Sequence, residues 1–320
     1  MKSAIIGLGV IGTVHAQVLT SQKKEIVAVC DTDESRFSVY AELPHYTDYK
    51  KMLDEIRPDV VHICTPHYLH AEMIIESLKR NINVFCEKPM CIKKEDIAKI
   101  LKAEAESSAQ LGVCLQNRYN AANIFVKDYL KNKHIRDAAG FVVWHRDKEY
   151  YNSAPWRGKR DTEGGGVLIN QALHTLDLLQ WFIGEPDYVT AAVSNLTLAD
   201  DIEVEDTVSA VFGGKKKFTF FATNGGAVGI PVEITVLTDN DYIKLLTSEV
   251  IINDKPISFD KDERIYGKYC YGTGHERIID DFYRCVQNGE KFAIDGTEGG
   301  KVLKLIFGVY ESNGKKVKIE

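Results

Sequence analysis

The sequence of 320 residues lacks long apolar runs, paired cysteines and blocks of like charge. No apolar stretch reaches the roughly 18 residues that a membrane-spanning helix needs, and the glycines in the apolar N-terminus argue against a signal peptide. The seven cysteines are odd in number and include no C-x-x-C pair, a pattern typical of reduced cysteines in a protein core. These absences predict a cytoplasmic protein with reduced cysteines and no membrane contact.

Charge further limits the class of partner. Lysine and arginine are dispersed along the chain, and the net charge of −6 with a pI near 5.9 argues against a nucleic-acid ligand. Histidine, cysteine and acidic residues form no cluster with metal-ligand spacing, so we expect no metal site. The hydrophobic content of 44% is ordinary for a globular chain of about two domains.

The most informative segment that is present is a glycine turn of the form G-x-G-x-x-G after a short apolar run. The first glycine permits a tight turn, the second lets backbone approach a pyrophosphate, and the third lets helix and strand pack closely. A helix that begins here offers unpaired N–H groups to phosphates. The turn therefore predicts a dinucleotide site formed by Gly7, Leu8, Gly9, Val10, Ile11 and Gly12.

Asp31 ends the next apolar run, 19 residues after Gly12. A carboxylate at that point accepts hydrogen bonds from ribose hydroxyls and repels a 2′-phosphate. The predicted cofactor is therefore NAD. NADP stays the alternative, because Arg36 and Lys50 follow closely in the sequence.

Strand and helix patterns alternate up to about residue 117 and then change. The alternation predicts an α/β domain, residues 1–118, with a doubly wound parallel Rossmann sheet. Beyond it we expect one helix over 167–182, then long β-rich runs that end with 229–247, and two closing helices. Consecutive strands without intervening helices predict a second α/β domain, residues 119–320, with an open, mostly antiparallel mixed sheet. The closing helices can pack back on the first domain.

Polar residues follow three of the expected strands of the first domain: Thr65-Pro66-His67, Glu87-Lys88-Pro89 and Gln116-Asn117-Arg118-Tyr119. Open parallel sheets bind ligands beyond the carboxyl ends of their strands, so three such segments favour a lined cleft over separate surface loops. Lys88 has mostly apolar neighbours, and desolvation lowers the pKa of an amine toward values useful for proton transfer. The alternative interpretation is a solvated lysine at a strand end.

A second constellation begins at Glu163 and continues through three glycines to Asn170, His174 and Asp177. On one continuous helix, Asn170 and His174 would share a face, and Asp177 would follow His174 by three residues. This pattern favours an acid/base imidazole that Asp177 orients. A structural helix histidine is the alternative.

Together these residues resemble the glucose–fructose oxidoreductase/inositol dehydrogenase family (Gfo/Idh/MocA). The resemblance rests on the glycine turn, on Thr65-Pro66 with His70, on Glu87-Lys88-Pro89, and on the glycine run with His174 and Asp177. It implies a nicotinamide-binding Rossmann domain and a C-terminal sheet that serves as the interface of a homodimer or homotetramer. It also implies reversible oxidation of a secondary hydroxyl on a sugar, nucleotide sugar or cyclitol.

The resemblance assigns roles to individual residues. Lys88 acts beside nicotinamide and substrate, and His174 is the acid/base. Asn170 departs from the family pattern, which has aspartate there. Because an amide cannot relay a proton, Asn170 joins this catalytic set as a positioning partner. The cofactor site is completed by Thr65, Pro66, His70 and Glu87.

The same resemblance places four residues along the substrate pocket: Arg118, Tyr119, Trp156 and Arg157. Aromatic faces suit the C–H surface of a sugar, and arginine suits hydroxyl, carboxylate or phosphate groups. Trp156 also suits a role in domain packing. We therefore expect an NAD(P)-dependent dehydrogenase acting on CH–OH donors. A keto-sugar or imine reductase and a non-catalytic dinucleotide sensor are the alternatives.

Overall fold

The computed structural model describes residues 1–247, 249–259, 266 and 272–320. The chain divides into two compact units. The first comprises Met1–Gln116 with the described part of Glu263–Gly300, and the second comprises the described part of Asn117–Asp262 with Lys301–Glu320. The sequence-based boundary at residue 118 lies near the first division, and residues after about 262 return to the first unit before residue 300.

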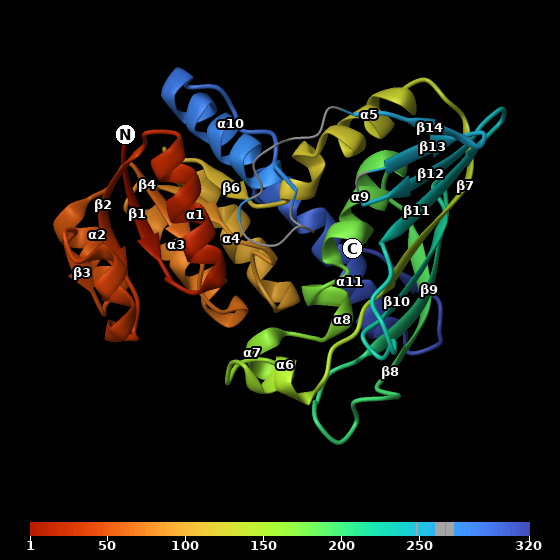
Figure 1. The fold of residues 1–320 in the computed structure, drawn as a ribbon, viewed down its shortest axis with the longest axis horizontal. Helices are drawn as coiled ribbons and strands as arrows, with labels where there is room; N and C mark the ends of the chain where they lie inside the picture. The colour runs from red at the N-terminus through yellow and green to blue at the C-terminus, as the bar shows by residue number, and fades with distance from the viewer. Residues whose placement is uncertain (248, 260–265, 267–271) are drawn as a thin grey trace. The chain divides into compact units, whose positions relative to one another are not determined.

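The first unit contains a parallel sheet of six strands in the order β3-β2-β1-β4-β5-β6 (Figure 1). This is the strand order of a Rossmann fold, so the predicted doubly wound parallel sheet is confirmed. The strands are β1 (Lys2–Ile6), β2 (Glu25–Cys30), β3 (His45–Tyr46), β4 (Val60–Ile63), β5 (Asn83–Cys86) and β6 (Leu111–Val113). The helices between them are α1 (Val10–Ser21), η1 (Glu34–Tyr40), α2 (Tyr49–Ile56), η2 (His67–Leu69), α3 (His70–Lys79) and α4 (Lys94–Glu106).

Helix α10 (Gly274–Asn288) belongs to this unit although it is distant in sequence. Phe282 of α10 packs against Phe85 of β5, with ring centroids 5.2 Å apart. The same ring occupies the space beside Gly112 of β6, where a Cβ would come within 2.7 Å of it. The apolar face of α10 thus completes the core of the first unit.

The second unit contains a mixed sheet of nine strands in the order β14-β13-β12-β11-β7-β10-β9-β8-β15. All neighbouring strands are antiparallel except β7 and β10, which confirms the predicted open, mostly antiparallel sheet. The strands are β7 (Ile135–Val143), β8 (Tyr188–Ser194), β9 (Thr207–Gly213), β10 (Phe218–Thr223), β11 (Glu233–Thr238), β12 (Tyr242–Leu246), β13 (Glu249–Ile252), β14 (Lys255–Ile257) and β15 (Val317–Lys318).

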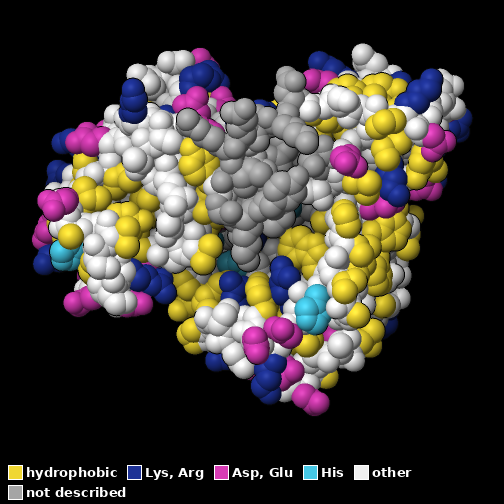
Figure 2. Space-filling model, in the orientation of Figure 1, with side chains coloured by type: hydrophobic (Ala, Val, Ile, Leu, Met, Phe, Trp, Pro, Cys, Tyr) yellow, Lys and Arg dark blue, Asp and Glu magenta, His cyan; other side chains and the backbone are white. Residues whose placement is uncertain are grey.

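Helices cover one face of this second sheet (Figure 1). The helices of the unit are α5 (Ala121–Tyr129), α6 (Lys148–Asn152), α7 (Arg160–Glu163), α8 (Val167–Asn170), α9 (Leu173–Ile183) and most of α11 (Gly296–Ser312). The other face carries no helix in the described part of the unit, and it exposes Phe141, Val211, Leu237 and Tyr242. Figure 2 shows hydrophobic side chains gathered along this part of the molecule.

The prediction of one helix over residues 167–182 is wrong. The structure has two helices, α8 and α9, separated by Gln171 and Ala172. The carbonyl oxygen of Val167 accepts from the N–H groups of both Gln171 (3.1 Å) and Ala172 (2.8 Å), which widens the turn and ends α8. Asn170 and His174 therefore do not share the face of one continuous helix.

The long β-rich run at 229–247 also divides, into the hairpin strands β11 and β12. Six cysteines are buried with free thiols: Cys30, Cys64, Cys86, Cys91, Cys114 and Cys285. The seventh, Cys270, lies outside the described residues. Among the described helices, none combines the length and the apolar character required to cross a bilayer.

Candidate active site

The glycine turn joins β1 to α1 at the carboxyl end of the first sheet (Figure 1). Gly7 has a φ of +90°, and a Cβ at this position would lie 2.6 Å from the carbonyl oxygen of Cys64. A Cβ on Gly12 would lie 1.9 Å from the carbonyl oxygen of Gly7. Around Gly9, by contrast, the nearest atom is Nη1 of Arg36 at 3.7 Å. Packing thus requires glycine at positions 7 and 12. Gly9 is open to the side where a pyrophosphate is expected, so the turn fits a dinucleotide.

Asp31 follows directly on β2 and is fastened to the turn. Its Oδ2 accepts the backbone N–H of Leu8 at 2.7 Å, and its Oδ1 accepts that of Asp33 at 2.9 Å. Nη1 of Arg36 lies 3.0 Å from the same Oδ2, and the Arg36 side chain is 44% exposed. An acid and a base therefore both lie beside the turn. The roles of Asp31 and Arg36 in the choice between a ribose hydroxyl and a 2′-phosphate stay predictions.

His70 connects the two segments that follow β4 and β5. Its Nδ1 lies 2.7 Å from the carbonyl oxygen of Pro89, and its Nε2 lies 2.8 Å from that of Thr65. Burial lowers the pKa of His70, and the bonds to the two carbonyl oxygens oppose that shift. The imidazole thus holds Thr65-Pro66 close to Glu87-Lys88-Pro89, as the predicted lining of one sheet edge requires.

A buried chain of hydrogen bonds, here called the histidine network, runs through the first unit to Glu87. Nδ1 of His15 lies 2.9 Å from Nδ1 of His62, and Nε2 of His15 lies 3.1 Å from Oε1 of Glu87. Nε2 of His62 lies 2.9 Å from Oη of Tyr283, which lies 2.7 Å from Oγ of Ser3. One proton arrangement satisfies these contacts with Glu87 ionised. Tyr283 donates to His62, Nδ1–H of His62 donates to His15, and Nε2–H of His15 donates to Glu87.

The end of the histidine network lies against the backbone of Lys88. Oε2 of Glu87 accepts the N–H of Lys88 at 3.2 Å, and Nε2 of His275 lies 3.5 Å from Oε1. Although burial acts to raise it, the pKa of Glu87 is held well below its usual range by hydrogen bonds from His15 and His275. An ionised, anchored Glu87 therefore fixes the start of the Lys88 segment.

The same region places four groups of ligand type close together. Donor atoms of His15, Glu87, Cys114 and His275 lie within 4.8 Å of one another, and all four residues are buried. Their donor types are those that zinc accepts, and burial raises the pKa of the Cys114 thiol well above its usual value. Sequence spacing missed this cluster because its members come from different elements. The His15–Glu87 contact within the cluster is a hydrogen bond of the network. The predicted absence of a metal stays a prediction.

In the second unit, Glu163 organises the segment around Asn170. The carboxylate of Glu163 is fully buried and accepts hydrogen bonds from the backbone N–H of Gly158 and from the side-chain amide of Asn170. Burial raises the pKa of Glu163. The amide nitrogen of Asn170 is thus engaged by a carboxylate that the sequence analysis had not assigned to the site.

The glycine run before Asn170 makes room for a second buried acid. Glu205 accepts hydrogen bonds from the backbone N–H groups of Gly166 at 2.8 Å and Leu168 at 3.1 Å, and from Oη of Tyr310 at 3.0 Å. A Cβ on Gly166 would lie 1.8 Å from the carbonyl oxygen of Glu205. The run is therefore a packing requirement at the start of α8, with a carboxylate at the helix N-terminus.

Asp177 of α9 forms a buried ion pair with Arg118. Nε of Arg118 lies 2.8 Å from Oδ2 and Nη2 lies 2.6 Å from Oδ1, in the bidentate geometry that is strongest for this pair. Arg118 is 4% exposed. This contact commits much of the guanidinium to Asp177, and the contact of Arg118 with a substrate stays a prediction. His174 lies one turn earlier on α9 and is partly buried.

Aromatic rings and guanidinium groups alternate in a second cluster, here called the arginine stack: Trp144, Arg146, Tyr150, Arg157 and Trp156. Cζ of Arg146 lies 4.9 Å from the ring centroid of Trp144 and 4.7 Å from that of Tyr150. Cζ of Arg157 lies 4.5 Å from the ring centroid of Tyr150 and 4.6 Å from that of Trp156. Such contacts fix the planes of the guanidinium groups.

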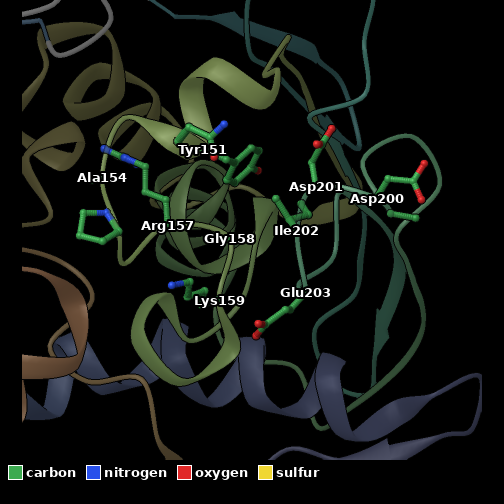
Figure 3. A pocket seen from close by; sticks show the side chains of 12 residues that line it. Tyr151, Ala154, Arg157, Gly158, Lys159, Asp200, Asp201, Ile202 and Glu203 are labelled. Atoms are coloured by element: carbon green, nitrogen blue, oxygen red, sulfur yellow. The ribbon is translucent and has the colours of Figure 1, made fainter.

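Arg157 also lines a pocket of about 380 Å³ in the second unit (Figure 3). Its other lining residues include Lys159 and three acids, Asp200, Asp201 and Glu203. Figure 3 shows the side chain of Arg157 pointing away from Asp200 and Asp201. The pocket thus has walls of opposite charge, and Arg157 belongs to the basic one.

The predicted site residues fall into two groups, one in each unit. The glycine turn, Asp31, the Thr65 and Glu87 segments and Lys88 belong to the first unit. The second unit holds Arg118, Tyr119, Trp156, Arg157, Asn170 and His174. Within the second group, Arg157 donates to Tyr150, which also accepts from Gln171, and Asn170 donates to Glu163. Neither Tyr150 nor Glu163 was among the predicted site residues.

Comparison with known proteins agrees with this division. Residues 1–115 match the model of the oxidoreductase family with an NAD-binding Rossmann fold, and residues 126–239 match the C-terminal domain of the GFO/IDH/MocA proteins. The chain therefore belongs to the GFO/IDH/MocA family. It is an NAD-binding oxidoreductase, as the glycine turn and the resemblance predicted.

Individual relatives are distant. An uncharacterised oxidoreductase, YrbE, of Bacillus subtilis is 23% identical over 93% of this chain and 89% of its own length. An inositol 2-dehydrogenase of Salmonella typhimurium is 27% identical, but over 60% of this chain and 57% of that enzyme. The solved WlbA dehydrogenase of Chromobacterium violaceum, in complex with NADH and UDP-GlcNAcA, is 28% identical with a TM-score of 0.89. That match covers 100% of this chain and 96% of the other.

Proposed function

We propose that the chain is a dehydrogenase that transfers hydride between a nicotinamide cofactor and a carbinol carbon of a sugar, nucleotide sugar or cyclitol. The observation that carries this proposal is the open glycine turn fastened to Asp31, in a chain of an NAD-binding oxidoreductase family. The inositol 2-dehydrogenase and WlbA relatives support the substrate class.

Within this proposal, the cofactor supplies the hydride chemistry and the protein manages position and protons. The cofactor is held by the turn from Gly7 to Gly12, by Asp31, and by the segments that start at Thr65 and Glu87. Lys88 and His174 exchange the hydroxyl proton of the substrate as general acid and base. Asn170, whose amide nitrogen is engaged by Glu163, positions a substrate hydroxyl through its amide oxygen.

The test is turnover by the purified full-length protein. NAD⁺ is offered with a panel of aldoses, uronates, cyclitols and nucleotide sugars, NADH is offered with the corresponding ketones and imines, and absorbance at 340 nm is followed. Oxidation of at least one hydroxyl substrate is expected. Binding of NAD without turnover in either direction would favour the sensor alternative, and turnover of imines alone would favour the reductase.

The exposed face of the second sheet supports the further proposal of a homodimer or homotetramer. Val211 is 56% exposed on β9, and Phe141 pairs with Phe221 on neighbouring strands. Contiguous exposed apolar side chains are typical of interaction surfaces. Light scattering on the purified protein tests this, and Val211→Glu is expected to shift the mass toward the monomer. A monomeric parent protein would contradict it. The cytoplasmic location stays a prediction.

A further inference from the structure

The arginine stack holds two positive charges that no described carboxylate neutralises by an ion pair. Elsewhere in the described chain, arginines such as Arg36, Arg80 and Arg118 contact acids directly. The contacts of Arg146 and Arg157, by contrast, are with aromatic rings, one carbonyl oxygen and one hydroxyl. Paired arginines stabilise the fold by themselves, whereas unpaired charges at fixed positions are suited to an incoming anion.

The guanidinium edges in the stack are largely uncommitted among the described residues. Nη1 of Arg146 donates to the carbonyl oxygen of His145 at 2.7 Å, and Nη1 of Arg157 donates to Oη of Tyr150 at 2.6 Å. Nε of each arginine is buried and has no hydrogen-bond partner in the described part of the chain. A guanidinium carries five N–H donors, and the described contacts leave Nη2 of each group without a hydrogen bond among the described residues.

Stacking fixes these donors in advance. Each guanidinium contacts two aromatic rings, with its Cζ 4.5–4.9 Å from the ring centroids, and these contacts restrict the positions that the group can take. Less side-chain freedom then remains to be lost when a ligand binds. The stack therefore presents two guanidinium forks that both contact Tyr150.

Hydrogen bonds connect the stack to the segment of the proposed substrate site. Oη of Tyr150 accepts the side-chain amide of Gln171 at 3.0 Å, and Gln171 directly follows Asn170. Arg157 precedes Gly158, whose N–H is held by the same Glu163 that binds Asn170. A ligand group at the stack would thus lie within the second unit's part of the site.

The positive charge of Arg157 acts to lower the pKa of the buried Glu163, although no ion pair joins the two among the described residues. Acids of the pocket wall have other partners. Asp201 forms an ion pair with Lys148 at 2.9 Å, and Glu203 accepts the N–H of Arg160 at 3.3 Å. Arg157 points away from the Asp200 and Asp201 side of the pocket (Figure 3). The acidic wall therefore leaves the positive charge of the stack available for an anion.

We propose that the substrate carries an anionic group, a carboxylate or a phosphate, which binds at the arginine stack through Arg146 and Arg157. Both groups match the planar fork of a guanidinium. A neutral polyol would leave two partly desolvated charges without a counter-charge. The inference rests on the proposed function only in identifying the ligand as the sugar substrate.

Binding is measured by isothermal titration calorimetry on the full-length protein, with and without NADH. The probes are D-glucose, D-glucuronate, α-D-glucose 1-phosphate and UDP-glucose. At least one anionic probe is expected to bind about 10-fold more tightly than glucose, and its affinity should fall with added salt. Preference for glucuronate identifies a carboxylate site, and preference for either phosphorylated probe identifies a phosphate site. The same affinity, or none, for glucose and all anionic probes overturns the proposal.

Variants locate the site. Arg146→Gln and Arg157→Gln are each expected to lower the affinity for the preferred anion about 10-fold, more than they lower the affinity for glucose. Arg136→Gln is the matched control, because Arg136 is exposed and paired with Asp239. Arg157→Lys keeps the charge and loses the fork, so it should fall between the parent and the glutamine variant. Unchanged anion affinity in both glutamine variants overturns the proposal, and the salt dependence of the parent protein decides the question if a variant does not fold.

This experiment separates the inference from the proposed function. Oxidation of a neutral polyol, together with no preference for anionic probes, would overturn the inference and leave the dehydrogenase standing. Anion binding that depends on Arg146 and Arg157, without turnover of any probe, would support the inference and count against the dehydrogenase.

Discussion

The histidine network of the first unit and the arginine stack of the second treat their polar groups in opposite ways. In the first unit, the histidine network connects polar groups to one another, from Ser3 through His62 and His15 to Glu87. In the second unit, the arginine stack holds charges against aromatic faces and leaves most of their N–H donors uncommitted among the described residues. The first arrangement is complete without a ligand, whereas the second is suited to bind one.

The difference indicates whether each cluster contributes mainly to the free energy of folding or to the free energy of ligand binding. A buried network whose donors and acceptors are all matched stabilises and positions the elements that carry it, and the loss of one member leaves its partners desolvated. Stacked arginines at a partly exposed site contribute less to folding and more to recognition. The predictions below test this contrast.

The largest effect is expected on stability. Glu87→Ala removes the acceptor of His15 and His275 in a buried site, and we expect a loss of about 3–5 kcal/mol in the free energy of unfolding. Arg146→Ala, in the arginine stack, should cost about 1 kcal/mol. Urea unfolding of both variants measures the contrast, with Glu87→Gln as the isosteric control. Equal losses for Glu87→Ala and Arg146→Ala would contradict the distinction between the two clusters.

The second prediction concerns one proposed catalytic residue from each unit. Lys88→Ala and His174→Ala should each lower turnover at least about 10²-fold, the usual scale of general acid–base catalysis, and leave NAD affinity nearly intact. If the two residues act in one step, the double variant should lose less than the sum of the separate effects. Steady-state kinetics and NAD titration provide the measurements. Full activity of the His174 variant would contradict the proposed mechanism.

Two variants of Asn170 test its proposed positioning role in the same reaction. Asn170→Ala should mainly raise KM, because the residue is assigned a positioning role. Asn170→Asp introduces the residue that the resemblance led us to expect, and it places a second carboxylate against Glu163. Burial already raises the pKa of Glu163. We therefore expect activity of this variant to fall as pH rises, since the pair is tolerated only while one carboxyl is protonated. A pH profile identical to that of the parent would contradict this.

The third prediction concerns the choice between NAD and NADP. In the first unit Arg36 is paired with Asp31, unlike the arginines of the arginine stack. Asp31→Ser removes the repulsion of a 2′-phosphate, and we expect it to shift the ratio of NAD to NADP affinity about 10-fold toward NADP. Arg36→Ala should shift the ratio toward NAD by a smaller factor, because Arg36 is exposed and shared with Asp31 and Asp33. Fluorescence titration with both reduced cofactors measures the ratios. Equal binding of NADH and NADPH by the parent protein would count against the assignment of Asp31.

The smallest effect is the pH dependence of stability. Burial, with the neighbouring His15 and Lys24, lowers the pKa of His62 well below its usual value. Below about pH 6.5 the unfolded chain therefore binds more protons than the folded one, and stability falls as pH falls. We expect His62→Gln to reduce this fall by about 1 kcal/mol between pH 7.5 and 5.5. His145→Gln, which changes a half-exposed histidine of the second unit, is the control. An unaltered pH dependence in the His62 variant would contradict the prediction.

Much of the fold could be predicted because its signals are local. The turn from Gly7 to Gly12 and the acid at residue 31 define a strand–helix–strand unit within one short segment, and alternating apolar runs predicted the remaining strands of the first sheet. The predictions failed where a local pattern had competing partners. The run over 167–182 has helical periodicity, yet Gln171 leaves the helix and bonds with Tyr150 and Asn224.

The features of the site likewise separate into those that neighbouring residues encode and those that only the fold brings together. The sequence by itself determined the class of the protein, because tight turns, strand ends and glycine runs are encoded by neighbouring residues. Only the tertiary structure decided which charges are satisfied. His15, Glu87 and His275 come from α1, the end of β5 and α10, and Arg146 and Arg157 both contact the ring of Tyr150. Hydrogen bonds and ion pairs form only when their atoms lie within a few ångströms of one another. For residues far apart in the sequence, only the folded structure sets those distances.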